Sequence, residues 1–327
     1  MPKTAILAAT SSGMELARLL NEELPSSELV DTAHGVRKAL ETTWRSHDSI
    51  ICIMAAGIAV RCLSGLCRSK YQDPCVVVVD ERGHHAISLL SGHIGGGNLL
   101  AEKVAEISEG TAVITTASDV TGHTAVDLWT VEENLTIVNP DKIASISAKL
   151  IQKGHLEVHQ QCNFIKSFPE DFHSCTNPQD ADIVIALNSH TGSGLRLIPR
   201  VRYIGFGCRR GTTVDEFREV VADLETQDGL DLRSVGGAAS IDLKNDEQGL
   251  LEIAALYNWP LRFFTKDQIG SVTGSEKSEI VHQKIGVFGV CESAAILAAS
   301  GRSRNGRIII KKRKWERITA AVAETEY

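Results

Sequence analysis

A glycine-rich segment with one histidine is the densest group of residues able to do chemistry. Ser91 to Asn98 read S-G-H-I-G-G-G-N, between an apolar run and a stretch with helical periodicity. The successive glycines Gly95, Gly96 and Gly97 let the backbone approach a ligand and turn its N–H groups toward it, and a following helix N-terminus adds positive partial charge. The segment predicts a cradle for an anion or oxyanion. A tight turn that needs positive φ is the alternative explanation.

His93 lies inside this segment. Histidine titrates near neutral pH, so an imidazole beside backbone donors suits proton transfer. A histidine that only braces the loop is the alternative. No second histidine stands at metal-ligand spacing from His93, and the eight cysteines form no C-x-x-C pair. We therefore expect no metal site in the protein itself.

Polar residues also follow a short strand predicted over Ala112 to Thr115. Ligands of open parallel sheets bind at the carboxyl ends of strands, which makes this position a candidate site. The Asp119 carboxylate is a candidate for activating water. Capping of a turn or short helix by Ser118 or Asp119 is the alternative. The hydroxyl and carboxylate side chains concerned are Thr115, Thr116, Ser118 and Asp119.

The second half of the chain has a similar strand end. Gly205 to Thr212 read G-F-G-C-R-R-G-T, and Thr213 with Glu216 has capping-box spacing, which predicts a helix from that point. Two guanidinium groups above a helix N-terminus would hold carboxylates well. Such a place also favours a thiolate at Cys208, but no partner histidine stands nearby, so a close-packed thiol is the preferred interpretation.

Two more segments carry charge. Glu292 opens a helix predicted over Glu292 to Ala299, where its carboxylate suits either a helix start or catalysis. Arg302 to Arg317 hold eight basic residues and one acidic residue. That run predicts a solvated edge strand or a surface for a polyanion.

The elements that must position these residues follow an α/β pattern, with short β-branched runs between amphipathic helices. The 327 residues are enough for two domains. We predict an N-terminal α/β region with a mostly parallel, Rossmann-like sheet over residues 1–200, and a separate C-terminal α/β domain over 201–327. The N-terminal region divides into a core at 1–138 and a variable segment at 139–200. Predicted strands include Ala5 to Ala9, Ser49 to Met54, Val76 to Asp80, Leu232 to Ser234 and Ile285 to Phe288.

Composition narrows the class of protein. The formal charge of −7 is unlike that of a nucleic-acid binder that neutralises phosphates. The longest apolar run, Ile50 to Val60, is too short to span a membrane and suits a buried strand and turn. The N-terminus enters a strand-like segment without a cleavable leader, so we expect a cytoplasmic protein.

Several motifs in one order resemble the cobalt-precorrin-5A hydrolase family of anaerobic cobalamin biosynthesis, usually called CbiG. The resemblance covers nearly the whole chain. The motifs are G-I-A-V-R (57–61), D-P-C-V-V-V-V-D-E (73–81), L-L-S-G-H-I-G-G-G-N (89–98), I-T-T-A-S-D (114–119), G-F-G-C-R-R-G-T (205–212) and V-C-E-S-A-A-I-L-A-A (290–299).

The resemblance implies opening of the δ-lactone of cobalt-precorrin-5A and release of a two-carbon fragment as acetaldehyde, giving cobalt-precorrin-5B. It implies no further cofactor, because cobalt arrives inside the substrate, and it allows transient contact with neighbouring corrinoid methyltransferases. A carrier that holds the corrinoid without chemistry is the alternative.

The candidate residues for this reaction come from the motifs above, except for Lys70, which lies between the first two. Catalytic candidates are His93, Asp119 and Glu292. Substrate-binding candidates are Arg61, Lys70, Ser91, Gly92, Gly95, Gly96, Gly97, Asn98, Thr115, Thr116, Ser118, Cys208, Arg209, Arg210, Gly211 and Thr212.

Overall fold

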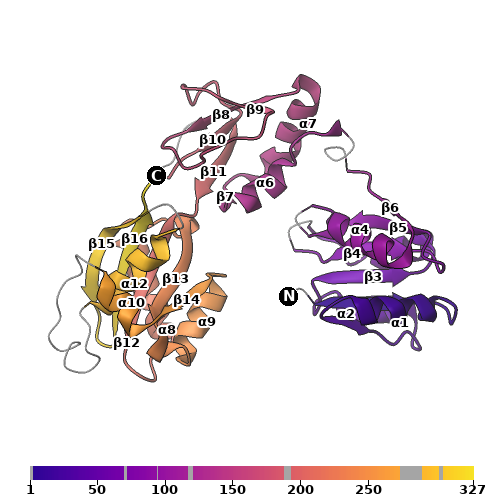
Figure 1. Cartoon of the computed structure of the whole chain (residues 1–327), viewed down its shortest axis with the longest axis horizontal. Coiled ribbons are helices and arrows are strands. Elements are labelled where there is room, and N and C mark those ends of the chain that lie inside the picture. The colour runs from indigo at the N-terminus through magenta and orange to yellow at the C-terminus, as the bar shows by residue number, and fades with distance from the viewer. Residues whose placement is uncertain are drawn as a thin grey trace. The chain divides into compact units, whose positions relative to one another are not determined.

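The computed structural model describes residues 3–69, 72–93, 95–116, 121–187, 193–272, 289–301 and 305–327 (Figure 1). Contacts divide the chain into two compact units. The first consists of Met1–Val131 with Ser147–Gly154, and the second of Glu132–Ile146 with His155–Tyr327. The boundary predicted after residue 200 falls between two strands of the second unit, β11 (Leu195–Pro199) and β12 (Arg202–Cys208).

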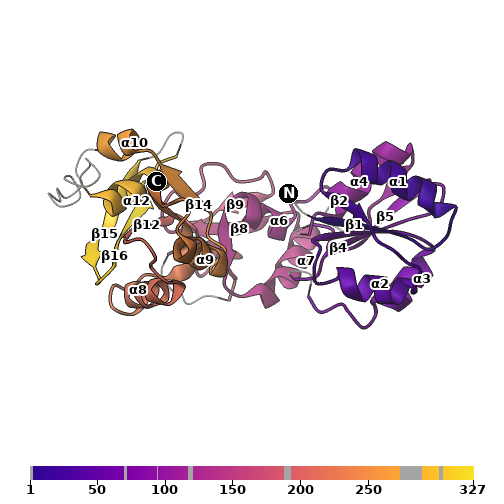
Figure 2. The ribbon, with the colours of Figure 1, turned by 90° about the horizontal axis from the view of Figure 1, so that it is seen from below.

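The first unit is a six-stranded sheet in the order β2-β1-β3-β4-β5-β6, covered by helices on both faces (Figure 2). Alternating apolar residues of each strand feed the two faces: Ile6 packs against α1 and α4, whereas Leu7 packs against α2 and α3. The strands are β1 (Thr4–Ala8), β2 (Ser27–Leu29), β3 (Ser49–Ile53), β4 (Cys75–Val79), β5 (His85–Leu90) and β6 (Thr111–Val113). The helices are α1 (Gly13–Glu23), α2 (Val36–Thr43), α3 (Ala56–Leu63) and α4 (Gly97–Ser108).

One reversal in this sheet decides where the glycine segment lies. β5 runs antiparallel to β4, with Val76 opposite Leu90, and β6 runs parallel to β5. The other neighbouring pairs in this sheet are parallel. The ends of β5 and β6 therefore lie at the edge where β1, β3 and β4 begin. Ser91 and the residues after it lie at the edge opposite the carboxyl ends of β1, β3 and β4.

The second unit begins with a five-stranded sheet in the order β7-β11-β10-β8-β9. Its strands pair in parallel except that β7 is antiparallel to β11. The further strands are β7 (Leu135–Ile137), β8 (Leu156–Gln160), β9 (Phe172–Ser174) and β10 (Ile183–Ile185), with a 3₁₀ turn at Pro140–Lys142. Helix α6 (Val126–Glu132) belongs to the first unit except for its last residue, and α7 (Ile143–Lys153) belongs to the first unit from Ser147 onward.

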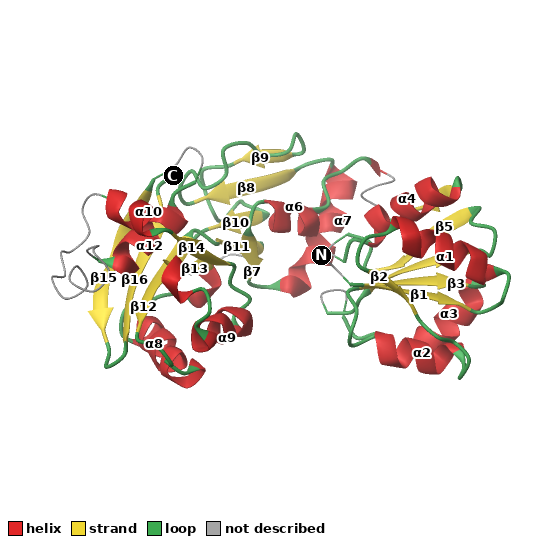
Figure 3. Cartoon of the chain, turned by 60° about the horizontal axis from the view of Figure 1, so that its bottom comes forward, coloured by secondary structure: helices red, strands yellow, loops and turns green. Residues whose placement is uncertain are grey.

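The C-terminal sheet has the order β14-β13-β12-β16-β15, with β12, β13 and β14 parallel and β15 and β16 antiparallel to their neighbours. Helices α8 and α9 cover one face, and α10 and α12 cover the other (Figure 3). The strands are β13 (Val235–Ile241), β14 (Leu261–Phe264), β15 (Gly306–Lys314) and β16 (Ile318–Thr325), and the helices are α8 (Val214–Thr226), α9 (Gln248–Leu256), α10 (Lys266–Ser271) and α12 (Val290–Ala299).

The α/β class is confirmed, and two local predictions are wrong. Leu232–Ser234 is a 3₁₀ turn rather than a strand, because the Asp231 carboxylate accepts the Arg233 N–H at 3.0 Å and closes the turn; the strand follows it as β13. The turn expected within Ile50 to Val60 is instead the start of α3. The strand predicted over Ile285 to Phe288 lies outside the described residues.

Candidate functional site

The glycine segment forms a closed loop ahead of α4. The Gly96 N–H donates to the His93 carbonyl at 2.9 Å, and the Gly97 N–H donates to the Ser91 carbonyl at 3.2 Å. The Asn98 N–H donates to the Gly92 carbonyl at 2.9 Å. These backbone donors, which we predicted would face a ligand, are therefore used within the loop itself.

The loop requires glycine for two different reasons. Gly96 has φ +79° with open space around it, so its backbone conformation excludes most other residues. Gly95 is excluded by space, because a Cβ there would lie 2.6 Å from the Ser91 carbonyl oxygen. At Gly97 a Cβ would lie 2.9 Å from the Leu90 carbonyl oxygen. The loop therefore has the positive φ of a tight turn at Gly96 and close backbone packing at Gly95 and Gly97.

The structure brings several N-terminal candidates to one edge. The Asn98 side-chain amide donates to the Thr116 hydroxyl at 3.2 Å, which joins the start of α4 to the end of β6. The Ser91 hydroxyl donates to the Asp73 carbonyl at 3.3 Å. His93 lies between these contacts in the sequence and is partly buried. Thr115 precedes Thr116 at the same strand end.

The other N-terminal candidates divide into placed and unplaced residues. Arg61 is exposed in the last turn of α3, and its carbonyl accepts a hydrogen bond from the Arg37 guanidinium at 2.8 Å. Lys70, Ser118 and Asp119 lie outside the described residues, so their roles stay predictions.

A separate cavity of about 450 Å³ lies at the carboxyl end of β1, on the opposite edge of the same sheet. Beside it, the Glu81 carboxylate accepts hydrogen bonds from the Thr10 hydroxyl at 2.7 Å and the Ser12 hydroxyl at 2.5 Å. The residues that line this cavity are Ala8, Ala9, Thr10, Ser11, Met14, Arg18, Thr32 and Ala33.

The loop after β12 does hold a carboxylate, and the carboxylate belongs to the protein. One Glu247 oxygen accepts the Gly211 N–H at 2.5 Å and the Thr212 N–H at 3.2 Å. The other lies 3.4 Å from the Lys244 ammonium nitrogen. Glu247 is buried, with 4% of its surface exposed. The predicted chemistry of this loop is present, but Gly211 and Thr212 serve an internal partner in this structure.

Arg210 is engaged in the same way. Its guanidinium pairs with Asp246, lies 3.8 Å from a Glu247 oxygen and donates to the Leu243 carbonyl at 2.8 Å. The hydrogen bond from Arg210 lowers the pKa of Asp246. Arg210 therefore braces the loop after β13 against the loop after β12. The predicted capping box at Thr213 and Glu216 is confirmed.

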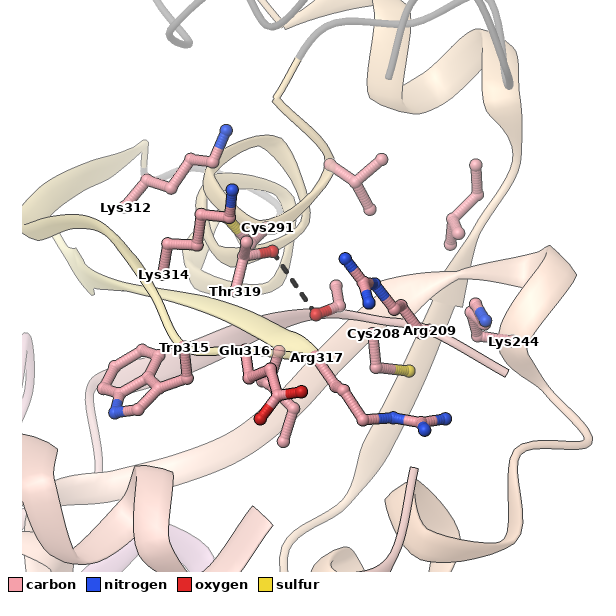
Figure 4. A pocket seen from close by; sticks show the side chains of 14 residues that line it. Cys208, Arg209, Lys244, Cys291, Lys312, Lys314, Trp315, Glu316, Arg317 and Thr319 are labelled. Atoms are coloured by element: carbon pink, nitrogen blue, oxygen red, sulfur yellow. Dashed lines mark hydrogen bonds between the residues drawn. The ribbon is translucent and has the colours of Figure 1, made fainter. Parts of the chain in front are cut away.

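A basic pocket lies beside this loop. It is a cavity of about 190 Å³ between the end of β12, the first turn of α12 and the turn that joins β15 to β16 (Figure 4). Five basic side chains and one acidic side chain line it, so positive charge predominates among its lining residues. The Arg317 guanidinium nitrogen Nε lies 3.6 Å from a Glu216 carboxylate oxygen. We define the basic pocket by its lining residues, Gly207, Cys208, Arg209, Ile241, Lys244, Val290, Cys291, Lys312, Lys314, Trp315, Glu316, Arg317, Ile318 and Thr319.

Helix α8 holds the turn between β15 and β16 in place. The Trp315 indole N–H donates to the Asp223 carboxylate at 2.7 Å, and the Arg313 guanidinium lies 4.9 Å from the centre of the Trp315 ring. The Arg209 N–H donates to the Arg317 carbonyl at 2.9 Å, which ties this turn to the end of β12. These contacts hold the basic side chains at the pocket rim.

The two thiols of the basic pocket are poor nucleophiles. Burial raises the pKa of Cys208 to about 11, and the nearby Lys244 lowers it only in part. Burial likewise raises the pKa of Cys291 to about 11. Both thiols are therefore protonated at neutral pH, which agrees with the preferred interpretation of Cys208 as a close-packed thiol.

Glu292 lies just behind the pocket wall. Only 3% of its surface is exposed, and its carboxylate accepts the Lys312 N–H at 3.0 Å. This bond joins the first turn of α12 to β15 and so positions the strand that carries Lys312 and Lys314. The contact is that of a positioning residue, and the catalytic role predicted for Glu292 has no support from it.

The sequence candidates missed most of the basic pocket. Lys244 comes from the turn after β13, and Lys312, Lys314 and Arg317 come from the β15–β16 hairpin. The available signal was the basic run from Arg302 to Arg317, for which a polyanion surface was one of two interpretations. The edge-strand interpretation is confirmed for β15, whose end lines the pocket, and the polyanion surface stays a prediction.

None of the helices in the described part of the chain has the length and apolar character needed to cross a membrane.

Comparisons with known proteins agree along the chain. The family profile "Cobalamin synthesis G N-terminal" matches residues 38–119, and "Cobalamin synthesis G C-terminus" matches residues 202–323. A cobalt-precorrin-5A hydrolase from Priestia megaterium is 29% identical, over 99% of this chain and 95% of its own. Another, from Salmonella typhimurium, is 30% identical, over 91% of this chain and 92% of its own.

Among solved structures, a cobalamin biosynthesis protein G homologue from Sulfolobus solfataricus aligns over 99% of this chain and 97% of its own, with 22% identity and a TM-score of 0.43. The sequence matches span both ends of the chain and nearly the full length of the curated relatives. The resemblance seen in the motifs is thereby confirmed, and the chain belongs to the cobalt-precorrin-5A hydrolase (CbiG) family.

Proposed function

We propose that this protein is a cobalt-precorrin-5A hydrolase of anaerobic cobalamin biosynthesis. It opens the δ-lactone of cobalt-precorrin-5A and releases the two-carbon fragment as acetaldehyde, which leaves cobalt-precorrin-5B. The observation that carries this proposal is the 30% identity to the Salmonella typhimurium hydrolase over 92% of that protein. The cobalt is part of the substrate, and the proposed reaction uses no other cofactor.

We assign the basic pocket to recognition of the substrate's carboxylate arms. A tetrapyrrole with acetate and propionate groups presents several negative charges, and guanidinium and ammonium groups bind such charges strongly. The cavity of about 190 Å³ is smaller than the roughly 300–1,000 Å³ of sites that enclose a whole ligand. It therefore fits one or two arms rather than the macrocycle.

We assign the hydrolytic step to the loop of His93. His93, or Asp119 farther along the chain, takes a proton from water as the water oxygen adds to the lactone carbonyl carbon. Collapse of the tetrahedral adduct breaks the ring C–O bond and frees a carboxylate and an alkoxide. The alkoxide then forms the aldehyde C=O, the C–C bond to the macrocycle breaks, and the macrocycle takes up the electron pair.

The oxyanion contact in this proposal falls on the backbone of Gly95 to Gly97. Because the N–H groups of Gly96 and Gly97 donate to carbonyls inside the loop, they reach a developing oxyanion only if the loop opens. The absence of a G-x-S-x-G elbow from the sequence argues against an acyl-enzyme. A cytoplasmic location and transient contact with corrinoid methyltransferases remain predictions from the sequence.

The decisive experiment is an anaerobic incubation of the purified protein with cobalt-precorrin-5A. Volatile aldehyde is trapped with a hydrazine reagent, and the corrinoid is followed by mass. We expect acetaldehyde in a one-to-one ratio with loss of the two-carbon unit from the macrocycle. Tight binding of the corrinoid without release of aldehyde would contradict the hydrolase function and support the carrier function, which no observation favours.

A further inference from the structure

Three metal-ligating side chains meet on the sheet formed by β7 to β11. The ligand atoms of His155, Glu157 and His173 all lie within 4.8 Å of one another. The His155 Nε2 is 3.9 Å from a Glu157 carboxylate oxygen, and the His155 and His173 rings are stacked, with centroids 4.8 Å apart. No residue of this cluster belongs to the glycine loop or the basic pocket.

Strand register puts these three side chains on one face. Glu157 of β8 stands directly opposite His173 of β9. His155 precedes Glu157 by two residues, and side chains two apart on a strand point to the same side. The cluster therefore follows from a His-x-Glu pattern on one strand and a histidine on its neighbour, two signals that are about 15 residues apart in the sequence.

Two further side-chain contacts hold the chain near the cluster. His159 follows Glu157 by two residues, and its Nδ1 lies 3.2 Å from the carbonyl oxygen of Cys175, the residue after β9. Below the cluster, the Asp182 carboxylate accepts the Glu157 N–H at 3.1 Å, which anchors the strand segment that carries Glu157. Glu157 and His173 thus lie on paired strands, and His155 directly precedes β8.

The donor set is that of a borderline divalent ion. Two imidazole nitrogens and one carboxylate oxygen form a well-known three-ligand zinc site, in which water takes the fourth position. His155 and Glu157 have 43% and 37% of their side chains exposed, so an ion and its water can reach them. Zinc holds such ligands at about 2.0–2.2 Å, so the three atoms must close by roughly an ångström through side-chain rotation.

We propose that His155, Glu157 and His173 bind a divalent metal ion of the zinc class. The ion joins β8 to β9, which is a three-residue strand at the edge of its sheet. Its role is a clip that fastens this edge strand. This site is separate from the cobalt of the proposed substrate, and the proposal does not depend on the hydrolase activity.

A zinc titration of the full-length protein tests the site. The protein is freed of metal with a chelator and titrated with Zn²⁺ in competition with a chromophoric zinc indicator, without corrinoid. We expect one equivalent in the wild type at micromolar or tighter affinity. His173→Ala and the isosteric Glu157→Gln should each weaken this binding by about tenfold or more. His34→Ala, an exposed histidine of the first unit, is the matched control and should bind as the wild type does.

Thermal unfolding provides the second readout. Binding to the folded state alone should raise the wild-type Tm by roughly 5 °C at a Zn²⁺ concentration of about 100 times the dissociation constant. His173→Ala should fold normally, because His173 is exposed, and should lose the shift. The proposal is overturned if the wild type takes up no zinc at tens of micromolar, or if His173→Ala and Glu157→Gln bind zinc as the wild type does.

Discussion

Glu247 contributes to the site in a way that its own position in the sequence did not suggest. Its buried carboxylate lies where we expected a substrate carboxylate, against the N–H groups of Gly211 and Thr212. Arg209, Lys312 and Lys314 line the basic pocket. Two further lining cations lie near carboxylates, Lys244 near Glu247 and Arg317 near Glu216. The proposed recognition of the substrate therefore falls on side chains that are next to the predicted motif.

Replacing Glu247 with Gln should destabilise the second unit. The amide oxygen can still accept the Gly211 and Thr212 N–H groups, but the NH₂ group then faces the Lys244 ammonium, so the charge pairing is lost. We expect a loss of about 2–4 kcal/mol in the free energy of unfolding, measured by urea denaturation. Asp246→Asn is the matched control, because Asp246 is 65% exposed and its ion pair with Arg210 should contribute less than about 1 kcal/mol. Equal losses in the two variants would contradict the role of Glu247.

His93 is the residue on which the proposed chemistry depends most. His93→Gln keeps a polar side chain but removes the proton acceptor, so kcat should fall by about 10² or more while KM changes little. Anaerobic aldehyde release measures both constants. The exposed His84→Gln on the same sheet is the control. Turnover within about threefold of the wild type would show that His93 only braces the loop.

At the scale of elements, α12 lies unusually close to β12. A Cβ added to Gly205 would lie 1.9 Å from the Cys291 carbonyl oxygen and 2.7 Å from the Ala295 nitrogen. Glycine at this position lets the helix backbone rest on the strand. The first turn of α12 carries Val290 and Cys291, so this close approach also forms one wall of the basic pocket.

Gly205→Ala should therefore push α12 away from the sheet. We expect a loss of at least about 3 kcal/mol of stability, together with weaker substrate binding, because overpacking of helix backbone has no rotamer that relieves it. Urea denaturation and KM for the corrinoid measure the two effects. Gly301→Ala is the control, since nothing lies within 4 Å of a Cβ there. A Gly205→Ala variant as stable as Gly301→Ala would refute the close packing.

Helices were the elements that the sequence predicted best. The helix predicted from the capping box at Thr213 is α8, and the helix predicted over Glu292 to Ala299 is α12, because local side chains determine both. β13 was missed because V-G-G-A-A-S-I has few β-branched residues; it is a strand because β12 and β14 flank it. The reversal of β5 was also unpredictable, since strand direction depends on pairing with distant residues.

The candidate site was predicted only in part, because some of its residues come from segments that are distant in the sequence. The loop after β12 and the glycine segment are continuous motifs, so sequence reasoning finds them. The basic pocket joins Arg209 to Lys314 and Lys244 through pairing of β12 with β13 and β16. The zinc-class cluster similarly depends on the register of β8 and β9. Such contacts between distant segments become visible only with the fold.

For the whole molecule, charge is unevenly distributed. The net charge is −7, yet the basic pocket has five cationic side chains and one acidic one. A net negative charge disfavours binding of polyanions in general, whereas the cations of the basic pocket favour a carboxylate at that place. Family membership and this charge pattern therefore agree on the class of substrate, while nucleic acid is disfavoured.

This arrangement predicts a dependence on ionic strength. Because salt shortens the screening length from about 10 Å at 0.1 M to about 3 Å at 1 M, KM for the corrinoid should rise several-fold with NaCl while kcat changes little. The double variant Lys312→Ala/Lys314→Ala should have a KM about tenfold higher at low salt and a weaker salt dependence. Lys311→Ala, on the same strand but not lining the pocket, should behave as the wild type. Identical salt profiles in all three proteins would exclude the pocket from substrate binding.

The buried carboxylate of Glu247 can also be deleted and replaced by a small anion from solution, which would restore the stability of the variant. Glu247→Ala would leave the Gly211 and Thr212 N–H groups and the Lys244 ammonium around a space of carboxylate size. Formate or acetate from the buffer can refill that space and recover stability in a concentration-dependent way. The loop would then act as a small-anion receptor whose affinity is directly measurable, and it would show how tightly this architecture holds a carboxylate arm that arrives from outside.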